Sequence, residues 1–137
     1  MVAMDVDGVL TSGEIIFING SEEIKIWNVK DRMGFALAHR TDNLKLCWIT
    51  GRESKEVARC AAECQIDAIY QKATKKKDAY ADLKAKYQLK DEEIAFLGDD
   101  LIDIPILRHA GLAICPADSP QEVKKEVDLV TKAEGGK

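Results

Sequence analysis

From Leu44 onward, apolar strand-like runs alternate with helical stretches, and this alternation restricts the possible fold more than any other feature of the chain. Parallel strands need a crossover connection, which is usually a helix, so such a pattern gives a parallel sheet with helices on both faces. We therefore predict an α/β fold built on a doubly wound parallel sheet. Strands and helices are expected in alternation at 44–50, 53–65, 66–70, 75–89, 94–98, 101–109 and 112–115, with a last short strand at Leu129 and Val130 and a cap or turn at 91–93.

The N-terminal third follows a different pattern. A first apolar run ends at Asp5, and two β-rich runs at 14–18 and 23–28 flank the segment Asn19-Gly20-Ser21-Glu22. Two such runs around Asn-Gly are typical of a β-hairpin. We expect a hairpin, spanning about 14–29, inserted after the first strand of the sheet.

Size and charge are those of an ordinary globular domain. The chain has 137 residues, 46% of them hydrophobic and 32% charged, which is enough to bury a core. We expect residues 1–137 to form a single domain. The net charge of -4 and the pI near 5.2 argue against nucleic acid or a membrane surface as partner. A small anionic ligand would have to be bound by local positive charge.

The lack of a targeting signal and the cysteine pattern predict a cytoplasmic protein. No apolar run approaches the roughly 20 residues that cross a membrane, and no signal peptide opens the chain. Cys47 and Cys115 lie in apolar runs, while Cys60 and Cys64 lie one turn apart on a predicted helix. We interpret all four as free thiols, because zinc needs more ligands than this last pair and no histidine has finger-like spacing.

The segment Asp5-Val6-Asp7-Gly8 closes the first strand with two carboxylates and a glycine. Residues two apart on a strand point the same way, so Asp5 and Asp7 begin on one face, and Gly8 lets the chain turn away. This pair suits one nucleophilic and one acid/base carboxylate around a bound cation. By itself Asp7-Gly8 is equally a hairpin-turn signal. An EF-hand calcium loop is disfavoured, because its twelfth position would be Ile16 instead of a bidentate Glu.

Later strands also end in polar residues. Thr50-Gly51-Arg52 follows the second strand, the lysine run Lys75-Lys76-Lys77 follows the third, and Gly98-Asp99-Asp100 follows the fourth. The carboxyl ends of parallel strands share one edge of the sheet, where ligands bind. Each group has a simpler interpretation, namely a strand-end threonine, a solvated lysine face and helix-capping acids. Their common edge and their order together favour a site.

The side chains at this edge suit hydrolysis of a phosphate monoester. Carboxylates of Asp5 and Asp99 are hard oxygen ligands for Mg²⁺, and with Asp7 they are the expected metal ligands. Once the cation neutralises the phosphate, Asp5 would attack phosphorus and form an aspartyl-phosphate. Asp7 would protonate the leaving oxygen and then take a proton from the hydrolytic water.

The remaining polar residues would support that reaction. The Thr50 hydroxyl and the backbone amides near Gly8 and Gly51 are expected to bind phosphate oxygens, and a lysine of the 75–77 run to offset their charge. Asp100 and Asp103 are expected to orient the metal waters and the lysine.

These residues resemble the motifs of the haloacid dehalogenase superfamily of phosphotransferases. Asp5-Val6-Asp7-Gly8-Val9 resembles its first motif, Thr50 its second, and Gly98-Asp99-Asp100-Leu101-Ile102-Asp103 its fourth. The third motif is a lysine that related sequences place six residues after the position of Tyr70, which here is Lys76. The resemblance implies a Rossmann-like core. Both gaps between motifs are too short for a cap domain, so the chain is identified as a capless member.

Among capless members, the chain most resembles the 3-deoxy-D-manno-octulosonate 8-phosphate phosphatases, through the hairpin, 28–31, 49–54 and Gly135-Gly136. That resemblance implies hydrolysis of this sugar-acid phosphate in lipopolysaccharide biosynthesis, Mg²⁺ as cofactor, and a homotetramer whose hairpins line neighbouring sites. Arg52 follows the pattern of this family, and its guanidinium would pair with a substrate carboxylate. The other interpretation of Arg52 is a surface arginine at a helix start.

Three alternatives remain at this stage. Similar enzymes act on a nine-carbon sugar acid 9-phosphate, and similar modules serve as oligomerisation domains of sialic-acid activating enzymes. Intact Asp5, Asp7, Lys76 and Asp99 argue against a non-catalytic module. A phospho-receiver domain shares the acidic cluster and the lysine, but receivers carry the acceptor Asp at the end of a middle strand, which here ends in Thr50.

Overall fold

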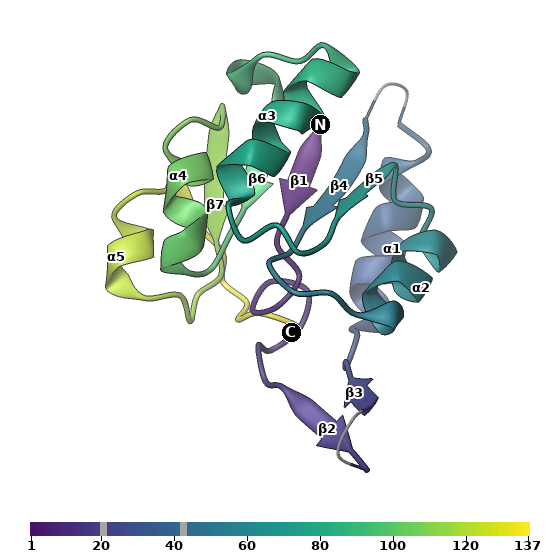
Figure 1. Cartoon of the computed structure of the whole chain (residues 1–137). Coiled ribbons are helices and arrows are strands. Elements are labelled where there is room, and N and C mark those ends of the chain that lie inside the picture. Colours follow the sequence, from purple (N-terminus) through teal and green to yellow (C-terminus); the bar gives the residue numbers. More distant parts are fainter. Residues whose placement is uncertain (20–21, 42–43) are drawn as a thin grey trace.

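A six-stranded parallel sheet forms the centre of the computed structural model, which describes residues 1–19, 22–41 and 44–137 (Figure 1). In the strand order β5-β4-β1-β6-β7-β8, the first strand is central and each pairing is parallel. The doubly wound sheet predicted from the alternation is confirmed. Its strands are β1 (Val2–Met4), β4 (Leu46–Ile49), β5 (Ala68–Tyr70), β6 (Ala95–Leu97), β7 (Leu112–Cys115) and β8 (Leu129–Val130).

Helices cover both faces of the sheet (Figure 1). The alternate residues of β4 show why: Cys47 and Ile49 join the core beneath α3, α4 and α5, whereas Leu46 and Trp48 join the core beneath α1 and α2. Successive side chains of a strand point to opposite faces, so a strand that is apolar throughout needs a helical layer on each side. The helices are α1 (Val29–Ala38), α2 (Lys55–Glu63), α3 (Lys76–Tyr87), α4 (Ile104–Leu107) and α5 (Gln121–Lys124).

The register of the central strand determines which loops meet. Met4 of β1 is paired with Trp48 of β4 on one side and with Leu97 of β6 on the other. One residue further, the N–H of Asp5 still donates to the carbonyl of Leu97 at 2.9 Å. The residues that follow these three strands therefore come together at the carboxyl edge of the sheet.

The predicted hairpin projects from this same edge (Figure 1). Its strands are β2 (Ile16–Ile18) and β3 (Glu22–Ile24), which pair antiparallel. They are shorter than the expected 14–18 and 23–28, because residues 25–28 run back towards the core. Of the segment Asn19-Gly20-Ser21-Glu22, in which the turn was expected, Gly20 and Ser21 lie outside the described residues.

Trp27 and Asn28 anchor the base of the hairpin. The Trp27 ring stacks on Trp48, with 5.5 Å between ring centroids and 15° between the ring planes. The Asn28 side chain accepts the N–H of Lys30 at 3.0 Å, which caps α1, and its Nδ2 donates to the carbonyl of Gly136 at 3.3 Å. The hairpin is therefore tied to the sheet, to a helix and to the C-terminal segment at once.

Two short 3₁₀ turns complete the fold. The single helix predicted over 101–109 is divided into η2 (Leu101–Asp103) and α4, because Asp100 caps the turn and Asp103 points inward. Residues 91–93, expected as a cap or turn, form η1 (Asp91–Glu93). The four cysteines are free and buried, as predicted. Within 1–19, 22–41 and 44–137, no helix combines the length and apolar character that crossing a membrane requires.

Candidate active site

The predicted nucleophile, Asp5, lies immediately after β1 and is 5% exposed. Its Oδ1 accepts the N–H of Val6 at 2.7 Å, and its Oδ2 lies 2.7 Å from the Nζ of Lys76. Lys76 is the first residue of α3 and is buried, whereas the neighbouring Lys75 and Lys77 are exposed. Of the three lysines in the run, the fold brings Lys76 to the nucleophile.

Asp103 holds Lys76 from the other side. The Nζ of Lys76 donates to Asp103 Oδ1 at 2.7 Å, and Asp103 Oδ2 accepts the N–H groups of Asp99 and Asp100 at 3.1 and 3.3 Å. A Cβ at Gly98 would lie 2.5 Å from the Cβ of Asp103, so this packing requires the glycine. The carboxylate of Asp100 is instead exposed and caps η2. Asp103 thus orients the lysine, and Asp100 contributes its backbone.

Asp99 completes a group of three carboxylates. One oxygen each from Asp5, Asp99 and Asp103 lie within 4.8 Å of one another. Oδ1 of Asp99 is buried and has no hydrogen-bond partner in the described part of the chain. Gly8, with φ of +91°, makes room for this carboxylate, because a Cβ there would lie 2.0 Å from Asp99 Oδ2. The turn of the first motif therefore packs directly on the fourth.

Burial and mutual repulsion disfavour ionisation of these carboxyl groups. Burial raises the pKa of Asp5 to about 6, against the opposing charge of Lys76, and Asp103 adds to the rise. Burial, followed by repulsion from Asp5 and Asp103, raises the pKa of Asp99 to about 7. A hard cation would relieve both effects, and an all-oxygen donor set suits Mg²⁺. The residues present fit a magnesium ion held by Asp5 and Asp99.

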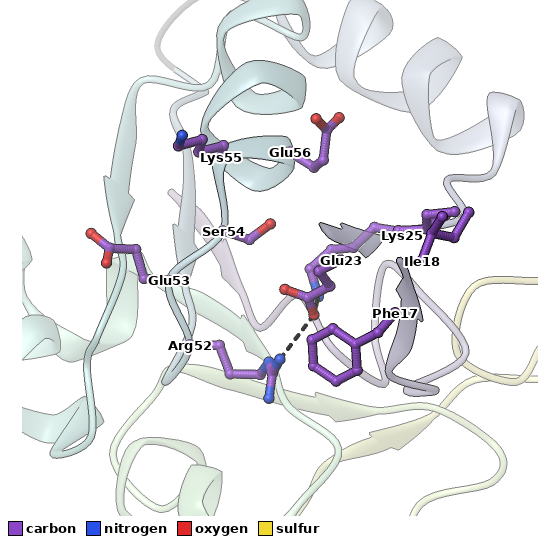
Figure 2. A pocket seen from close by; sticks show the side chains of 10 residues that line it. Phe17, Ile18, Glu23, Lys25, Arg52, Glu53, Ser54, Lys55 and Glu56 are labelled. Carbon is purple, nitrogen blue, oxygen red and sulfur yellow. Dashed lines mark hydrogen bonds and ion pairs between the residues drawn. The ribbon is translucent and has the colours of Figure 1, made fainter. Parts of the chain in front are cut away.

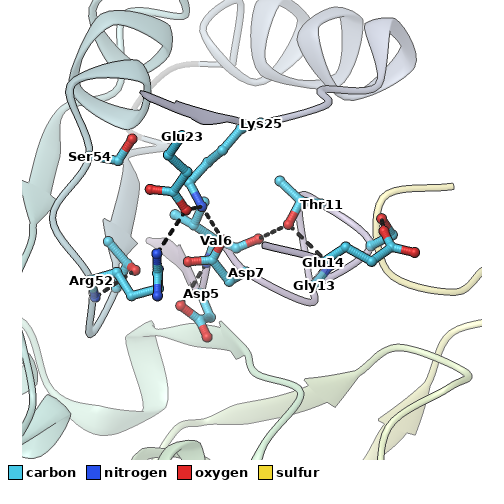
Figure 3. Close-up of polar contacts among 12 residues, drawn as sticks. Asp5, Val6, Asp7, Thr11, Gly13, Glu14, Glu23, Lys25, Arg52 and Ser54 are labelled. Carbon is cyan, nitrogen blue, oxygen red and sulfur yellow. Dashed lines mark hydrogen bonds and ion pairs between the residues drawn. The ribbon is translucent and has the colours of Figure 1, made fainter. Parts of the chain in front are cut away.

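Asp7, predicted both as the acid/base residue and as a metal ligand, faces the hairpin (Figure 3). Its carboxylate lies outside the group of three carboxylates formed by Asp5, Asp99 and Asp103. Its Oδ1 forms an ion pair with the Nζ of Lys25, which also donates to Glu23 Oε1 at 3.1 Å. The same Glu23 oxygen accepts from Nη2 of Arg52 at 3.0 Å. We call these four residues of alternating charge, Asp7, Lys25, Glu23 and Arg52, the hairpin charge chain. It leads from the predicted acid/base residue to the arginine predicted to bind substrate.

Thr50 and the two predicted loop glycines follow β4 and β1 at the same edge of the sheet. Thr50 is 1% exposed, its N–H donates to the carbonyl of Tyr70 at 2.8 Å, and its Oγ1 accepts the N–H of Arg52 at 3.2 Å. Within the described residues, the amides of Gly8 and Gly51 donate to no other group. Both amides are therefore available to an anion at this edge.

The double glycine near the C-terminus packs on the first-motif loop. The N–H of Gly136 donates to the carbonyl of Val9 at 3.0 Å. A Cβ at Gly135 would lie 2.0 Å from the carbonyl oxygen of Gly8. Side chains at these positions would push the C-terminal segment off the loop that carries Asp5 and Asp7.

Lys25 and Glu23 were not predicted as site residues. Their signal in the sequence is the alternation Glu23, Lys25, Trp27, which places all three on one side of an extended segment. What the sequence alone does not give is the direction in which the hairpin folds back, and that direction decides whether this side meets the site or solvent.

The comparisons with known proteins agree with the motifs. Residues 49–135 match the haloacid dehalogenase-like hydrolase family. The chain is 37% identical to the 3-deoxy-D-manno-octulosonate 8-phosphate phosphatase of Escherichia coli over 137 residues, which is 100% of this chain and 72% of that protein.

Solved structures agree in fold as well as in sequence. The 3-deoxy-D-manno-octulosonate 8-phosphate phosphatase from Yersinia pestis matches 98% of this chain and 72% of its own, with a TM-score of 0.95 and 36% identity. The one from Moraxella catarrhalis, solved with a magnesium ion, a phosphate ion and a KDO molecule, matches 98% and 77%, with a TM-score of 0.94 and 34% identity. The chain belongs to the haloacid dehalogenase-like hydrolases and, within them, to the 3-deoxy-D-manno-octulosonate 8-phosphate phosphatase family of phosphoric monoester hydrolases.

Proposed function

We propose that this protein is a magnesium-dependent phosphatase that hydrolyses 3-deoxy-D-manno-octulosonate 8-phosphate through an aspartyl-phosphate on Asp5. The observation that carries the proposal is the surroundings of Asp5. Its carboxylate is buried beside a buried lysine, Lys76, and beside Asp99, which has a buried oxygen without a partner. A nucleophile, a positive charge for the phosphate and a donor set for a metal ion thus meet at one point.

The residues divide the reaction between them. Asp5 attacks phosphorus, and its new bond forms as the bond from phosphorus to the sugar oxygen breaks. Asp7 gives its proton to the departing oxygen and, as a carboxylate, takes a proton from the water that cleaves the aspartyl-phosphate. Lys76 offsets the charge that the transferred group carries, and Asp103 holds the lysine in place.

Binding of the phosphate needs positive charge and N–H donors. When held by Asp5 and Asp99, Mg²⁺ supplies the charge that lets a phosphate dianion approach a carboxylate. The relative from Moraxella catarrhalis was solved with magnesium and phosphate ions, which supports this cofactor. The Thr50 hydroxyl and the free amides of Gly8 and Gly51 bind the phosphate oxygens.

A cleft beside the hairpin suits the sugar acid (Figure 2). It has a volume of about 820 Å³, within the range of small-molecule sites, and lies between the hairpin and the start of α2. Arg52 borders the cleft and donates one N–H group to Glu23. Its other N–H groups can bind a carboxylate. We assign the carboxylate of the substrate to Arg52. Arg52 also follows the sequence pattern of the eight-carbon enzymes, which supports the eight-carbon over the nine-carbon acid as substrate.

The hairpin also carries apolar side chains that its own chain leaves uncovered. Phe17 is 58% and Ile26 65% exposed, and Val29 and Met33 extend the apolar surface onto α1 at 75% and 61%. Patches of this kind on a monomer mark protein interfaces. We propose that the protein is a homotetramer in which the hairpin of each subunit lines the site of a neighbour. Its free cysteines fit the cytoplasm, where thiols stay reduced. Analytical ultracentrifugation should give four chains per particle, and a fully active monomer would refute this assembly.

Phosphate release with Mg²⁺ from a panel of phosphorylated sugar acids tests the function. We expect the eight-carbon 8-phosphate to give the highest kcat/KM, with the nine-carbon 9-phosphate as the main competitor. Asp5→Asn should lose about 10³-fold or more in kcat, because the amide is not a nucleophile. Asp82→Asn, which changes a carboxylate paired with Tyr70, serves as control. Full activity in Asp5→Asn would rule out the aspartyl-phosphate.

A further inference from the structure

Lys25 is a buried cation delivered to the site by the hairpin. Its side chain is 2% exposed, although the hairpin itself projects from the sheet. Its Nζ lies between Asp7 Oδ1 and Glu23 Oε1, and these two carboxylates are its ion-pair partners within the described residues. A buried ammonium group is tolerated when it is paired in this way. The position of Lys25 and the orientation of Asp7 are therefore mutually dependent.

The backbone that carries Lys25 is fixed on the core. Two residues later, Trp27 stacks on Trp48 of β4, and Asn28 caps α1 and binds the C-terminal segment. On the other side of the ion pair, Glu23 is held by Arg52 at 3.0 Å. Lys25 is thus held at its backbone and at its ammonium group.

The ion pair with Lys25 leaves the second carboxylate oxygen of Asp7, Oδ2, for proton transfer. With Oδ1 on Lys25, Oδ2 is buried and has no hydrogen-bond partner in the described part of the chain. An acid/base carboxyl group works when one oxygen is aimed at the proton acceptor and the group cannot rotate away. Lys25 supplies that restraint, because rotation of Asp7 would leave a buried ammonium group with one partner fewer.

We propose that Lys25 is a positioning residue for the acid/base carboxyl group of Asp7, with Glu23 as its anchor. The proposal rests on the acid/base role of Asp7 in the function proposed above. In the affected step, the bond from Asp5 to phosphorus forms, the bond from phosphorus to the leaving oxygen breaks, and the proton of Asp7 moves to that oxygen. A leaving group that departs as a stable anion does not need this proton.

This dependence on the leaving group separates positioning from a general structural role. Benzyl phosphate and p-nitrophenyl phosphate are similar in size and lack a carboxylate for Arg52. Benzyl alcohol is a much weaker acid than p-nitrophenol, so the departure of benzyl alcohol depends on the proton from Asp7. The parameter to compare is kcat/KM, which reports the steps from free enzyme through the departure of the alcohol.

In Lys25→Met we expect kcat/KM for benzyl phosphate to fall about 30-fold, which is part of the 10²–10⁴-fold that acid/base catalysis contributes. We expect kcat/KM for p-nitrophenyl phosphate to fall less than about 3-fold. Lys25→Arg, which keeps the charge and can bridge two carboxylates, should recover part of the loss with benzyl phosphate. The control is Lys45→Met, which breaks a lysine–aspartate pair with Asp67 at the opposite end of β4. It should leave both values near those of the wild type.

Equal losses with both esters in Lys25→Met, or no rescue by Lys25→Arg, would overturn the proposal. If Lys25→Met does not fold, Lys25→Gln replaces it in the same comparison, and equal losses there carry the same meaning. Failure of the proposed function would be distinct, because the wild-type enzyme would then release no phosphate from any phosphorylated sugar acid.

Discussion

Two lysines reach the reacting carboxylates from different parts of the molecule. Lys76 begins α3, and its side chain is fully buried. Both of its partners follow strands of the sheet, Asp5 directly after β1 and Asp103 in η2 after β6. Lys25 comes from the inserted hairpin, and its partners Asp7 and Glu23 are 18% and 12% exposed. One lysine belongs to the sheet edge and the other to the insertion.

The difference explains how the site divides its tasks. The register of the parallel sheet brings the segments that carry Asp5, Lys76 and Asp103 to one edge. In the proposed mechanism that group acts on phosphorus, whatever alcohol the ester carries. The hairpin borders the cleft proposed for the rest of the substrate, so in that mechanism its charges act on the leaving group and on selectivity.

The largest effect should come from Lys76→Met. The variant removes a positive charge from the transferred group and leaves Asp5 and Asp103 buried without their cation. We expect kcat/KM to fall about 10²–10³-fold, as when one charge-stabilising donor is removed, and to fall equally for benzyl and p-nitrophenyl phosphate. Lys77→Met, on the exposed neighbour, is the control. A loss that follows leaving-group basicity, as expected for Lys25→Met, would abolish the distinction between the two lysines.

A smaller and more selective effect is expected for Arg52→Gln. Loss of the pairing with the substrate carboxylate should raise KM for the phosphorylated sugar acid about 10-fold, which is about 1.4 kcal/mol. The effect is limited because the Arg52 side chain is 40% exposed and its charge is partly screened. Benzyl phosphate has no carboxylate, and its kcat/KM should change much less, because the glutamine amide can still donate a hydrogen bond to Glu23. Arg108→Gln breaks a surface pair with Glu126 and is the matched control. Equal changes for both substrates would show that Arg52 acts on the reaction instead of on selectivity.

The sheet-edge group, by which we mean Asp5, Thr50, Lys76, Asp99 and Asp103, was predictable from the sequence. Asp7 and Arg52 of the hairpin charge chain were predicted as well, but Lys25 and Glu23, which connect them, were not. Strand ends in a parallel sheet share an edge whatever the details, so Asp5, Thr50 and Asp99 could be brought together from their positions alone. Lys25 meets Asp7 through a hairpin whose direction depends on the stacking of Trp27 on Trp48, a contact between residues distant in sequence. Local patterns do not encode such contacts.

The carboxylates of the sheet-edge group should make stability depend on pH and Mg²⁺ together. Burial raises the folded-state pKa of Asp99 to about 7 and that of Asp5 to about 6, above the ordinary value of about 4. A raised folded-state pKa contributes stability at low pH, and this contribution is lost as pH rises through the folded value. Without metal, these two groups therefore stabilise the fold less at pH 8 than at pH 5.

Mg²⁺ should have the opposite dependence, because it binds the ionised carboxylates and competes with protons. Saturating Mg²⁺ should raise the thermal midpoint by about 5 °C at pH 8 and by about 1 °C or less at pH 5, compared with a chelator. Differential scanning fluorimetry at the two pH values measures both shifts, and Asp99→Asn should lose most of the shift at pH 8. Lys25→Met should keep the shift at pH 8, since the hairpin charge chain lies outside the group of three carboxylates formed by Asp5, Asp99 and Asp103. An equal shift at both pH values would mean that the ion binds elsewhere and that Asp5 and Asp99 have another role at the sheet edge.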